Sequence, residues 1–181
     1  MKALIFLADG FEEIEALTAA DYLRRLDIDA KLVSIYDRTE VEGASGIKVL
    51  ADTVLKDADT DSADALIIPG GLPGATNLRD DERVIDAVKS AYEKGKITAA
   101  ICAGPSVLQK AGIMEGKKAT CYPGFEEEVG DAVHTGKNVE KDGNIITGKG
   151  PYLAGDFAIE IARALLGDEK AEELSEQVLK K

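Results

Sequence analysis

A single cysteine stands where an apolar, strand-like segment gives way to a turn. Residues 97–101 are apolar or small, Cys102 follows them, and Ala103, Gly104 and Pro105 come next. A sharp strand-to-helix turn exposes a nucleophile and leaves backbone N–H groups free to bind an anion. Small residues keep space open around the thiol, and proline suits the first turn of a helix. The segment predicts a nucleophile elbow; the alternative is that Cys102 is a small buried hydrophobic residue.

Two glycines supply a second loop that could reach this thiol. Gly70 and Gly71 follow the apolar residues 65–68, and the absence of side chains lets a neighbouring backbone approach closely. The N–H groups of Gly71 and Ala103 are the candidate donors to an oxyanion. We also expect the dipole of the helix after Cys102 to favour its thiolate, which is the reactive form of cysteine.

An acidic segment near the start of the chain offers a proton donor. Glu15 has Phe11 four residues before it and Ala19 four residues after it, so its face of a helix is partly apolar. We expect its carboxyl group to be partly desolvated, with a raised pKa, and to share a proton with the sulfur. Glu12 and Glu13 are expected only to be solvated and to cap the helix.

The composition excludes several classes of function. The chain has 181 residues and a formal net charge of −12, with a single histidine, His134, and two cysteines. This charge repels a phosphate backbone, and no apolar run approaches the ~20 residues that a membrane-spanning helix needs. We therefore expect no nucleic-acid partner, no membrane segment, no metal and no cofactor. The cysteine usage is typical of the reducing cytoplasm.

Strand and helix patterns alternate along almost the whole chain, which predicts one α/β domain over residues 1–181. Its sheet should be doubly wound and mostly parallel, with helices on both faces. Expected strands cover residues 2–7, 30–36, 48–50, 65–68, 98–101, 118–121, 132–135 and a hairpin within 139–147. Expected helices cover residues 12–26, 81–94, 105–111, 151–166 and 169–179. The strands' carboxyl ends should bring the loops 8–15, 69–77 and 102–106 together.

Four segments in matching order resemble the ThiJ/PfpI superfamily. They are GFEEIE at 10–15, PGGLPGATNL at 69–78, AAICAGP at 99–105 and TGKGP at 147–151. More narrowly, the chain is similar to bacterial and archaeal members of the branch that contains the Parkinson's-linked protein deglycase. The likeness covers nearly the full chain, so it is far more specific than any one motif.

The resemblance implies a flavodoxin-like domain, related to class I glutamine amidotransferases, that usually forms a homodimer. It implies an oxidation-sensitive Cys102 at the elbow, hydrogen bonded by Glu15, with Gly70, Gly71 and Ala103 behind the sulfur. The activities it implies are glutathione-independent conversion of methylglyoxal to lactate, repair of early glycation adducts, and chaperone or redox-protective roles.

The chain departs from the family pattern at two positions. Tyr122 stands where members with a catalytic dyad often have histidine, so proton transfer would fall to Glu15, substrate or water. Ala103 stands where the peptidase branch has histidine, which disfavours a Cys-His protease. Tyr122 and Pro151 are expected to line the pocket. Cys121 should point the opposite way and be buried or a secondary oxidation site.

Two other residues receive structural interpretations. His134 sits near a predicted strand end, where a solvated or hydrogen-bonded role is expected rather than a catalytic one. Arg25 matches a family position near the dimer interface, but from the sequence it is a cation on a helix surface.

Two functions remain open. The first is a cofactor-free enzyme that acts on small dicarbonyls or their glycated adducts through Cys102 and Glu15. The second is a redox-sensing protective protein or chaperone that uses oxidation of Cys102 with little turnover. An intracellular cysteine peptidase is a third, less favoured hypothesis.

Overall fold

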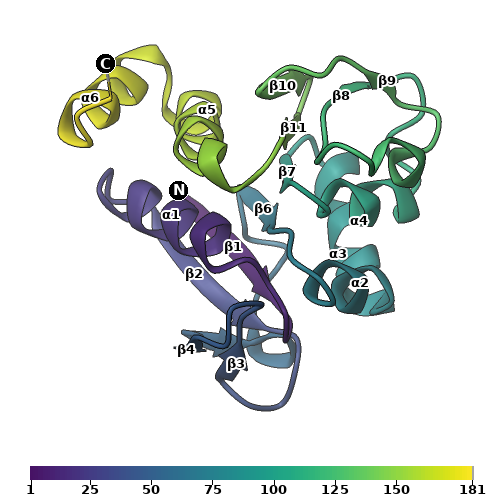
Figure 1. The fold of residues 1–181 in the computed structure, drawn as a ribbon. Helices are drawn as coiled ribbons and strands as arrows, with labels where there is room; N and C mark the ends of the chain where they lie inside the picture. Colours follow the sequence, from purple (N-terminus) through teal and green to yellow (C-terminus); the bar gives the residue numbers. More distant parts are fainter. Residues whose placement is uncertain (181) are drawn as a thin grey trace.

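A seven-stranded sheet forms the centre of the protein, whose computed structural model describes residues 1–180 (Figure 1). Its order is β10-β11-β7-β6-β1-β2-β5, and only the β10–β11 pair is antiparallel. The strands are β1 (Lys2–Leu7), β2 (Asp29–Ser34), β5 (Thr53–Val54), β6 (Ala65–Ile68), β7 (Ile97–Ile101), β10 (Val139–Asp142) and β11 (Ile145–Gly148). The expected mostly parallel α/β fold is confirmed.

Two small sheets lie outside this main one. The strands β3 (Glu40–Glu42) and β4 (Lys48–Leu50) form an antiparallel hairpin, and β8 (Lys118–Ala119) pairs in parallel with β9 (Val133–His134). The strand expected over 118–121 ends at Ala119. Beyond it, the N–H of Thr120 donates to Oγ1 of Thr147 at 2.9 Å, so a side chain replaces the next ladder bond.

Helices cover both faces of the sheet. They are α1 (Glu13–Arg24), α2 (Gly74–Arg79), α3 (Glu82–Glu93), α4 (Pro105–Lys110), α5 (Ala154–Leu166) and α6 (Asp168–Gln177), with 3₁₀ turns at Leu55–Asp57, Glu126–Val129 and Pro151–Leu153. The helices expected near 12–26, 81–94, 105–111 and 169–179 are present, and the one expected over 151–166 opens with a 3₁₀ turn. The short α2 was not expected, because glycine and proline at its start resemble a loop.

The two faces of β1 show how the layers are held. Ala3, Ile5 and Leu7 belong to the apolar core that includes α1 and α5, whereas Leu4 and Phe6 belong to the core that includes α2, α3 and α4. These two groups of helices lie on opposite faces of the sheet (Figure 1). Successive strand residues point to opposite faces. Because both faces are covered, the central strands are continuously apolar.

The strand order reverses between β1 and β6. The chain passes from β1 to β2 on one side, and then returns to place β6 and β7 on the other side. In such sheets, ligands bind beyond the carboxyl ends of the strands near this reversal. The loops after β1, β6 and β7 end there. None of the helices within residues 1–180 has the length and apolar character that a bilayer crossing requires.

Candidate active site

Cys102 occupies the turn between β7 and α4 and has the backbone of a nucleophile elbow. Its φ is +64°, a left-handed conformation that is strained for a residue with a side chain. The Cys102 N–H donates to the carbonyl of Gly148 at 2.9 Å, and the Cys102 carbonyl accepts from the N–H of Tyr122 at 3.0 Å. Pro105 is the first residue of α4, as expected. Backbone bonds on both sides therefore fix the strained residue.

Glu15 approaches this cysteine from the first turn of α1. Its side chain is only 1% exposed, and the N–H of Gly70 donates to its Oε2 at 2.6 Å. Oε1 has no partner of ordinary hydrogen-bond geometry within residues 1–180, but the Cys102 thiol lies close enough to interact with the carboxyl group. The structure thus brings together the predicted thiol and the predicted carboxyl.

Gly70 makes this close approach feasible. A Cβ atom at Gly70 would lie 2.6 Å from Cβ of Cys102 and 2.9 Å from both the Ala103 nitrogen and Oε2 of Glu15. Gly71 has a φ of +83°, and a Cβ there would lie 2.4 Å from the backbone nitrogen of Glu12. The loop after β6 therefore needs glycine at both positions to pass between the first helix and the elbow.

Burial governs the protonation of the pair. It raises the pKa of Glu15 to about 7, although the Gly70 N–H and the Cys102 thiol act in the opposite direction. Burial and the negative charge of Glu15 raise the pKa of Cys102 to about 12, against the hydrogen bonds that the Gly71 and Ala103 N–H groups donate to its sulfur. Because the two groups interact, the first proton lost near neutral pH belongs to the pair.

The backbone donors at this turn act in the expected direction, but they do not make Cys102 a thiolate, because its pKa is raised and not lowered. The helix α4 has six residues, and desolvation of the sulfur outweighs the favourable backbone donors. A thiolate beside an ionised Glu15 would place two negative charges in one buried site. The thiolate is therefore compatible chiefly with a protonated Glu15, which makes the carboxyl group part of the cysteine's chemistry.

A cavity of about 310 Å³ opens onto the sulfur. Its lining residues are Glu12, Gly71, Leu72, Cys102, Ala103, Tyr122, Phe125 and Pro151. Tyr122 and Pro151 line it as expected, whereas sequence reasoning missed Leu72 and Phe125. The Phe125 ring packs edge-on against Tyr122, with centroids 6.3 Å apart. The aromatic spacing of Tyr122 and Phe125 was the available signal, but it does not specify which way a loop folds.

Glu12 and Glu13 behave differently from each other. Glu12 caps α1 as expected, because its Oε1 accepts from the N–H of Ile14 at 3.3 Å. Glu13 is buried, and its Oε1 accepts from the N–H groups of Ser45 at 2.8 Å and Ile47 at 3.4 Å. The expectation of a solvated Glu13 is wrong because the β3–β4 hairpin folds over the first turn of α1.

The remaining singled-out residues take structural positions. Cys121 is 1% exposed, and burial raises its pKa to about 11, while Tyr122 is 45% exposed. The two side chains therefore point in opposite directions, as expected. His134 is exposed on β9 and does not line the Cys102 cavity. Arg25 lies at the carboxyl end of α1, where its Nε donates to Asp21 at 2.8 Å.

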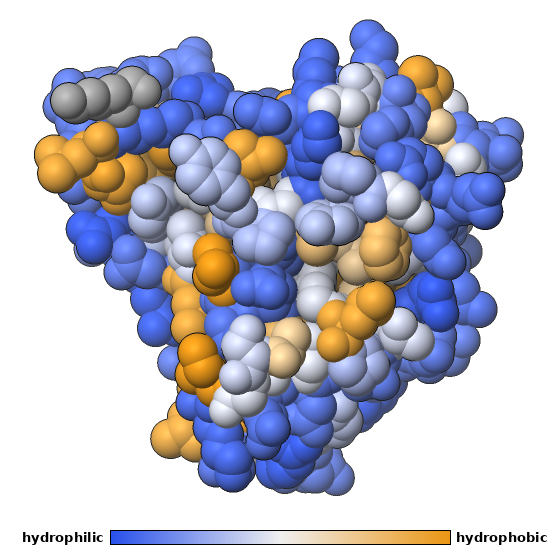
Figure 2. All heavy atoms as spheres, in the orientation of Figure 1, coloured by the Kyte–Doolittle hydropathy of each residue, from blue (hydrophilic) through white to orange (hydrophobic). Residues whose placement is uncertain are grey.

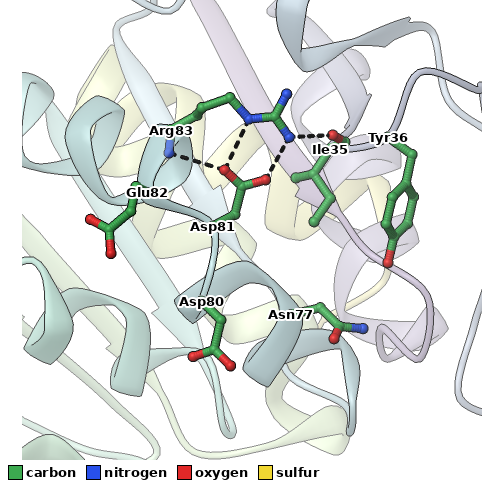
Figure 3. A pocket seen from close by; sticks show the side chains of 7 residues that line it. All are labelled: Ile35, Tyr36, Asn77, Asp80, Asp81, Glu82 and Arg83. Carbon is green, nitrogen blue, oxygen red and sulfur yellow. Dashed lines mark hydrogen bonds and ion pairs between the residues drawn. The ribbon is translucent and has the colours of Figure 1, made fainter.

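Another hollow, of about 420 Å³, lies between β2 and the start of α3 (Figure 3). Its cation, Arg83, donates to both carboxylate oxygens of Asp81 and to the carbonyl of Ile35. The guanidinium is thus already paired, and no nucleophilic cysteine is nearby. Within residues 1–180 no group of three or more His, Cys, Asp or Glu side chains is arranged to hold a metal ion.

The sequence matches the profile of the DJ-1/PfpI family over residues 1–164. Protein DJ-1 homolog B of Arabidopsis thaliana is 39% identical over 176 residues, which cover 96% of this chain but 40% of that protein. Protein dj-1beta of Drosophila melanogaster is 37% identical over 180 residues, covering 98% of this chain and 96% of that protein.

Solved structures agree with this assignment. The structure of Toxoplasma gondii DJ-1 in an oxidized form superposes with a TM-score of 0.92 at 34% identity, covering 98% of this chain and 97% of that one. The match covers nearly the whole of both chains, as expected from the ThiJ/PfpI resemblance. The chain belongs to the DJ-1/PfpI family.

Proposed function

We propose that the protein is a cysteine-dependent, cofactor-free glyoxalase or deglycase that acts on small dicarbonyls such as methylglyoxal, or on their adducts. Its role would be protection against carbonyl and oxidative stress. The observation that carries the proposal is a contact between two groups: a partly exposed thiol at a strained turn, beside a buried carboxyl group with a pKa of about 7. An acid that titrates near neutral pH can both donate and accept a proton.

The chemistry follows from this arrangement. The sulfur of Cys102 adds to the aldehyde carbon, the carbonyl π electrons move to oxygen, and the thiol proton passes through Glu15 to that oxygen, which gives a hemithioacetal. The Gly71 and Ala103 N–H groups, which donate to the sulfur, would hold the developing oxyanion.

Product formation requires a second proton transfer. Glu15 would remove the proton from the former aldehyde carbon and return a proton to the neighbouring ketone carbon, which produces a thioester of lactate. Water then cleaves the thioester and releases lactate and the free thiol. The aldehyde carbon is oxidised and the ketone carbon is reduced within one molecule, so the net reaction consumes only water. Lactate release in thiol-free buffer, compared between wild type and Cys102→Ser, tests the proposal.

A redox-sensing role is the second candidate. Cys102 is partly exposed at the cavity, whereas Cys121 is buried, and the Toxoplasma gondii relative was solved in an oxidized form. Two equivalents of peroxide convert a thiolate first to a sulfenate and then to a sulfinate. The Gly71 and Ala103 N–H groups and a proton on Glu15 would stabilise the sulfinate oxygens. A reducing cytoplasm would keep both cysteines as thiols between such events.

Graded oxidation distinguishes the two cysteines. With increasing peroxide, Cys102 should reach the sulfinate before Cys121 is modified, because only its sulfur is accessible from the cavity. Peptide mass spectrometry measures both sites in one sample. Oxidation of Cys121 first would remove the redox hypothesis. The peptidase hypothesis gains no support, since no histidine lines the cavity.

A homodimer is part of the proposal, and an apolar surface on α1 supports it. Ile14 and Leu17 on α1 and Ile47 on the hairpin are all exposed, and the bonds from Ser45 and Ile47 to Glu13 hold the hairpin against α1. Figure 2 shows apolar side chains over these elements. We name these three residues the α1 face. A second copy of the chain would cover it in a twofold arrangement.

A single charge on this face should prevent association. Ile14→Lys should convert a dimer to a monomer in light scattering, because an unpaired ammonium would be buried at the interface. Val133→Lys is the matched control: Val133 is 54% exposed and Ile14 is 55% exposed, but Val133 lies on β9, away from α1 (Figure 1). A wild type that is monomeric at micromolar concentration, or a dimer unaffected by Ile14→Lys, would contradict the proposed interface.

A further inference from the structure

A hollow next to the Cys102 cavity shares two lining residues with it. Its volume is about 390 Å³, and its lining residues are Tyr122, Pro123, Asn138, Lys149, Gly150, Pro151, Tyr152 and Leu153. Tyr122 and Pro151 line both hollows. We call the second one the distal hollow. A group attached to a carbonyl at Cys102 can therefore pass Tyr122 and continue into it.

The size of the two hollows exceeds what methylglyoxal fills. The cavity at the sulfur, at about 310 Å³, already lies in the range of roughly 300–1,000 Å³ that holds drug-sized ligands. Methylglyoxal is a three-carbon molecule and would occupy only the part next to the thiol. The distal hollow would then be empty during turnover of that substrate, and its residues would contribute nothing to recognition.

The walls of the distal hollow suit a flat apolar group. Two tyrosine rings, two prolines and Leu153 supply most of the lining. Tyr152 is 97% exposed, so its ring has almost no packing partner in the protein itself. Aromatic rings at such positions gain both area and ring–ring contact when a planar group stacks on them.

Charge changes sign between the two hollows. Glu12 lines the cavity at the sulfur, and Glu15 is buried beside it. Lys149 is the one charged residue among those lining the distal hollow, and its ammonium group donates to the carbonyl of Gly136 at 3.3 Å. A carboxylate next to the reacting carbonyl would meet two acidic groups. A carboxylate at the far end of the ligand would meet an ammonium group with N–H donors to spare.

We propose that the distal hollow is a substrate subsite for dicarbonyls, or their adducts, that carry an aromatic or apolar body ending in a carboxylate. Tyr152 and Lys149 are its specificity-determining residues. This inference rests on the proposed function only in placing the reacting carbonyl at Cys102. It predicts that the enzyme prefers extended substrates with a remote negative charge over both small dicarbonyls and 2-oxo acids.

The role of Lys149 is tested with two matched substrates. The ratio of kcat/KM for 4-carboxyphenylglyoxal to that for phenylglyoxal should fall about five-fold in Lys149→Gln, as for the loss of one partly exposed charge pair. Lys141→Gln is the control, because Lys141 is exposed on β10 and lines neither hollow. It should leave the ratio unchanged. An equal ratio in wild type and Lys149→Gln would overturn the assignment.

Tyr152 is tested with a different ratio. In Tyr152→Ala, kcat/KM for phenylglyoxal relative to methylglyoxal should fall about five-fold, because one stacking surface is lost. The mass of the variant in solution is measured alongside. A change in the ratio that occurs only together with a change in oligomeric mass would show that Tyr152 acts through subunit contacts, and would overturn the subsite.

Alkylation separates this inference from the proposed function. The Cys102 sulfur displaces iodide from 4-(iodoacetamido)benzoate or from iodoacetamide, and neither reaction requires turnover. Cys102 should react faster with the benzoate reagent than with iodoacetamide, and the ratio of the two rates should fall in Lys149→Gln and in Tyr152→Ala. Mass spectrometry measures both rates at Cys102. If the protein forms no lactate but reacts faster with the benzoate reagent, the proposed function is contradicted and the subsite is supported. If the protein forms lactate but reacts equally fast with both reagents, the proposed function is supported and the subsite is contradicted.

Discussion

Cys102→Ser should lower kcat/KM for methylglyoxal by about 1,000-fold or more. The hydroxyl group is a far weaker nucleophile than sulfur. Glu15 is the carboxyl group that interacts with residue 102, whereas Glu12, which lines the cavity, caps α1 through the N–H of Ile14. The substitution is nearly isosteric, so the strained turn and its bonds to Gly148 and Tyr122 should persist. Lactate is measured in thiol-free buffer, so that methylglyoxal forms no hemithioacetal with free thiols in the solution.

Cys121→Ala is the matched control for this experiment. Cys121 precedes Tyr122 in the chain but is buried and points away from the cavity. Its removal should change the rate by less than a few-fold, although it leaves a small void in the core. Equal lactate production by wild type and Cys102→Ser, or a larger loss in Cys121→Ala, would remove Cys102 from the mechanism.

Glu15→Gln should lower kcat/KM by about 100- to 1,000-fold, the range associated with a general acid–base group. The amide keeps the size of the carboxyl group and an oxygen that can accept the N–H of Gly70, but it cannot carry the proton between the two carbons. The measurement is the same lactate assay. Retention of the full wild-type rate in Glu15→Gln would show that water or substrate moves the proton.

The same variant should be more stable than wild type above neutral pH. The pKa of Glu15 is about 7 in the fold against 4.5 ordinarily, so the folded state holds its proton more tightly than the unfolded chain. The contribution of Glu15 to stability is then fully present below about pH 4.5 and is lost as the pH rises through about 7. The free energy of unfolding falls by about 3 kcal/mol over this range, because each unit of difference between the folded and unfolded pKa values corresponds to roughly 1.4 kcal/mol.

Denaturant unfolding at pH 5 and pH 8 measures this difference. Glu15→Gln should unfold at higher denaturant than wild type at pH 8, and the gap should narrow at pH 5. Activity and stability would thus move in opposite directions, which misfolding cannot produce. A variant that is less stable than wild type at pH 8 would mean that Glu15 supports the fold in its ionised form.

Local sequence patterns were sufficient for the parts of the site that chain order determines. Residues 97–105 specify a buried strand, a bend and a helix, and Cys102 is found at that bend. The apolar face around Glu15 indicated its burial, because residues four apart lie on one side of a helix. Gly70 and Gly71 were identified because only residues without side chains permit close approach of another backbone.

Contacts between segments that are far apart in the sequence could not be predicted from local patterns. Glu13 is buried by a hairpin more than thirty residues away in the chain (Ser45 and Ile47), so its local acidic pattern was misleading. The pKa of Cys102 depends on how much solvent the loops around it exclude, which spacing does not encode. Leu72 and Phe125 reach the cavity through loop conformations that no periodic pattern describes.

The pH dependence of Cys102 alkylation by iodoacetamide tests most directly whether thiol and carboxyl act as one unit. The measurement uses Cys121→Ala protein, in which Cys102 is the one remaining thiol. The alkylation rate should rise with a midpoint near pH 7 and rise again only at strongly alkaline pH. Adding Glu15→Gln should abolish the step near pH 7 and leave a single alkaline one. Identical profiles with and without Glu15→Gln would contradict the coupling on which the proposed chemistry depends.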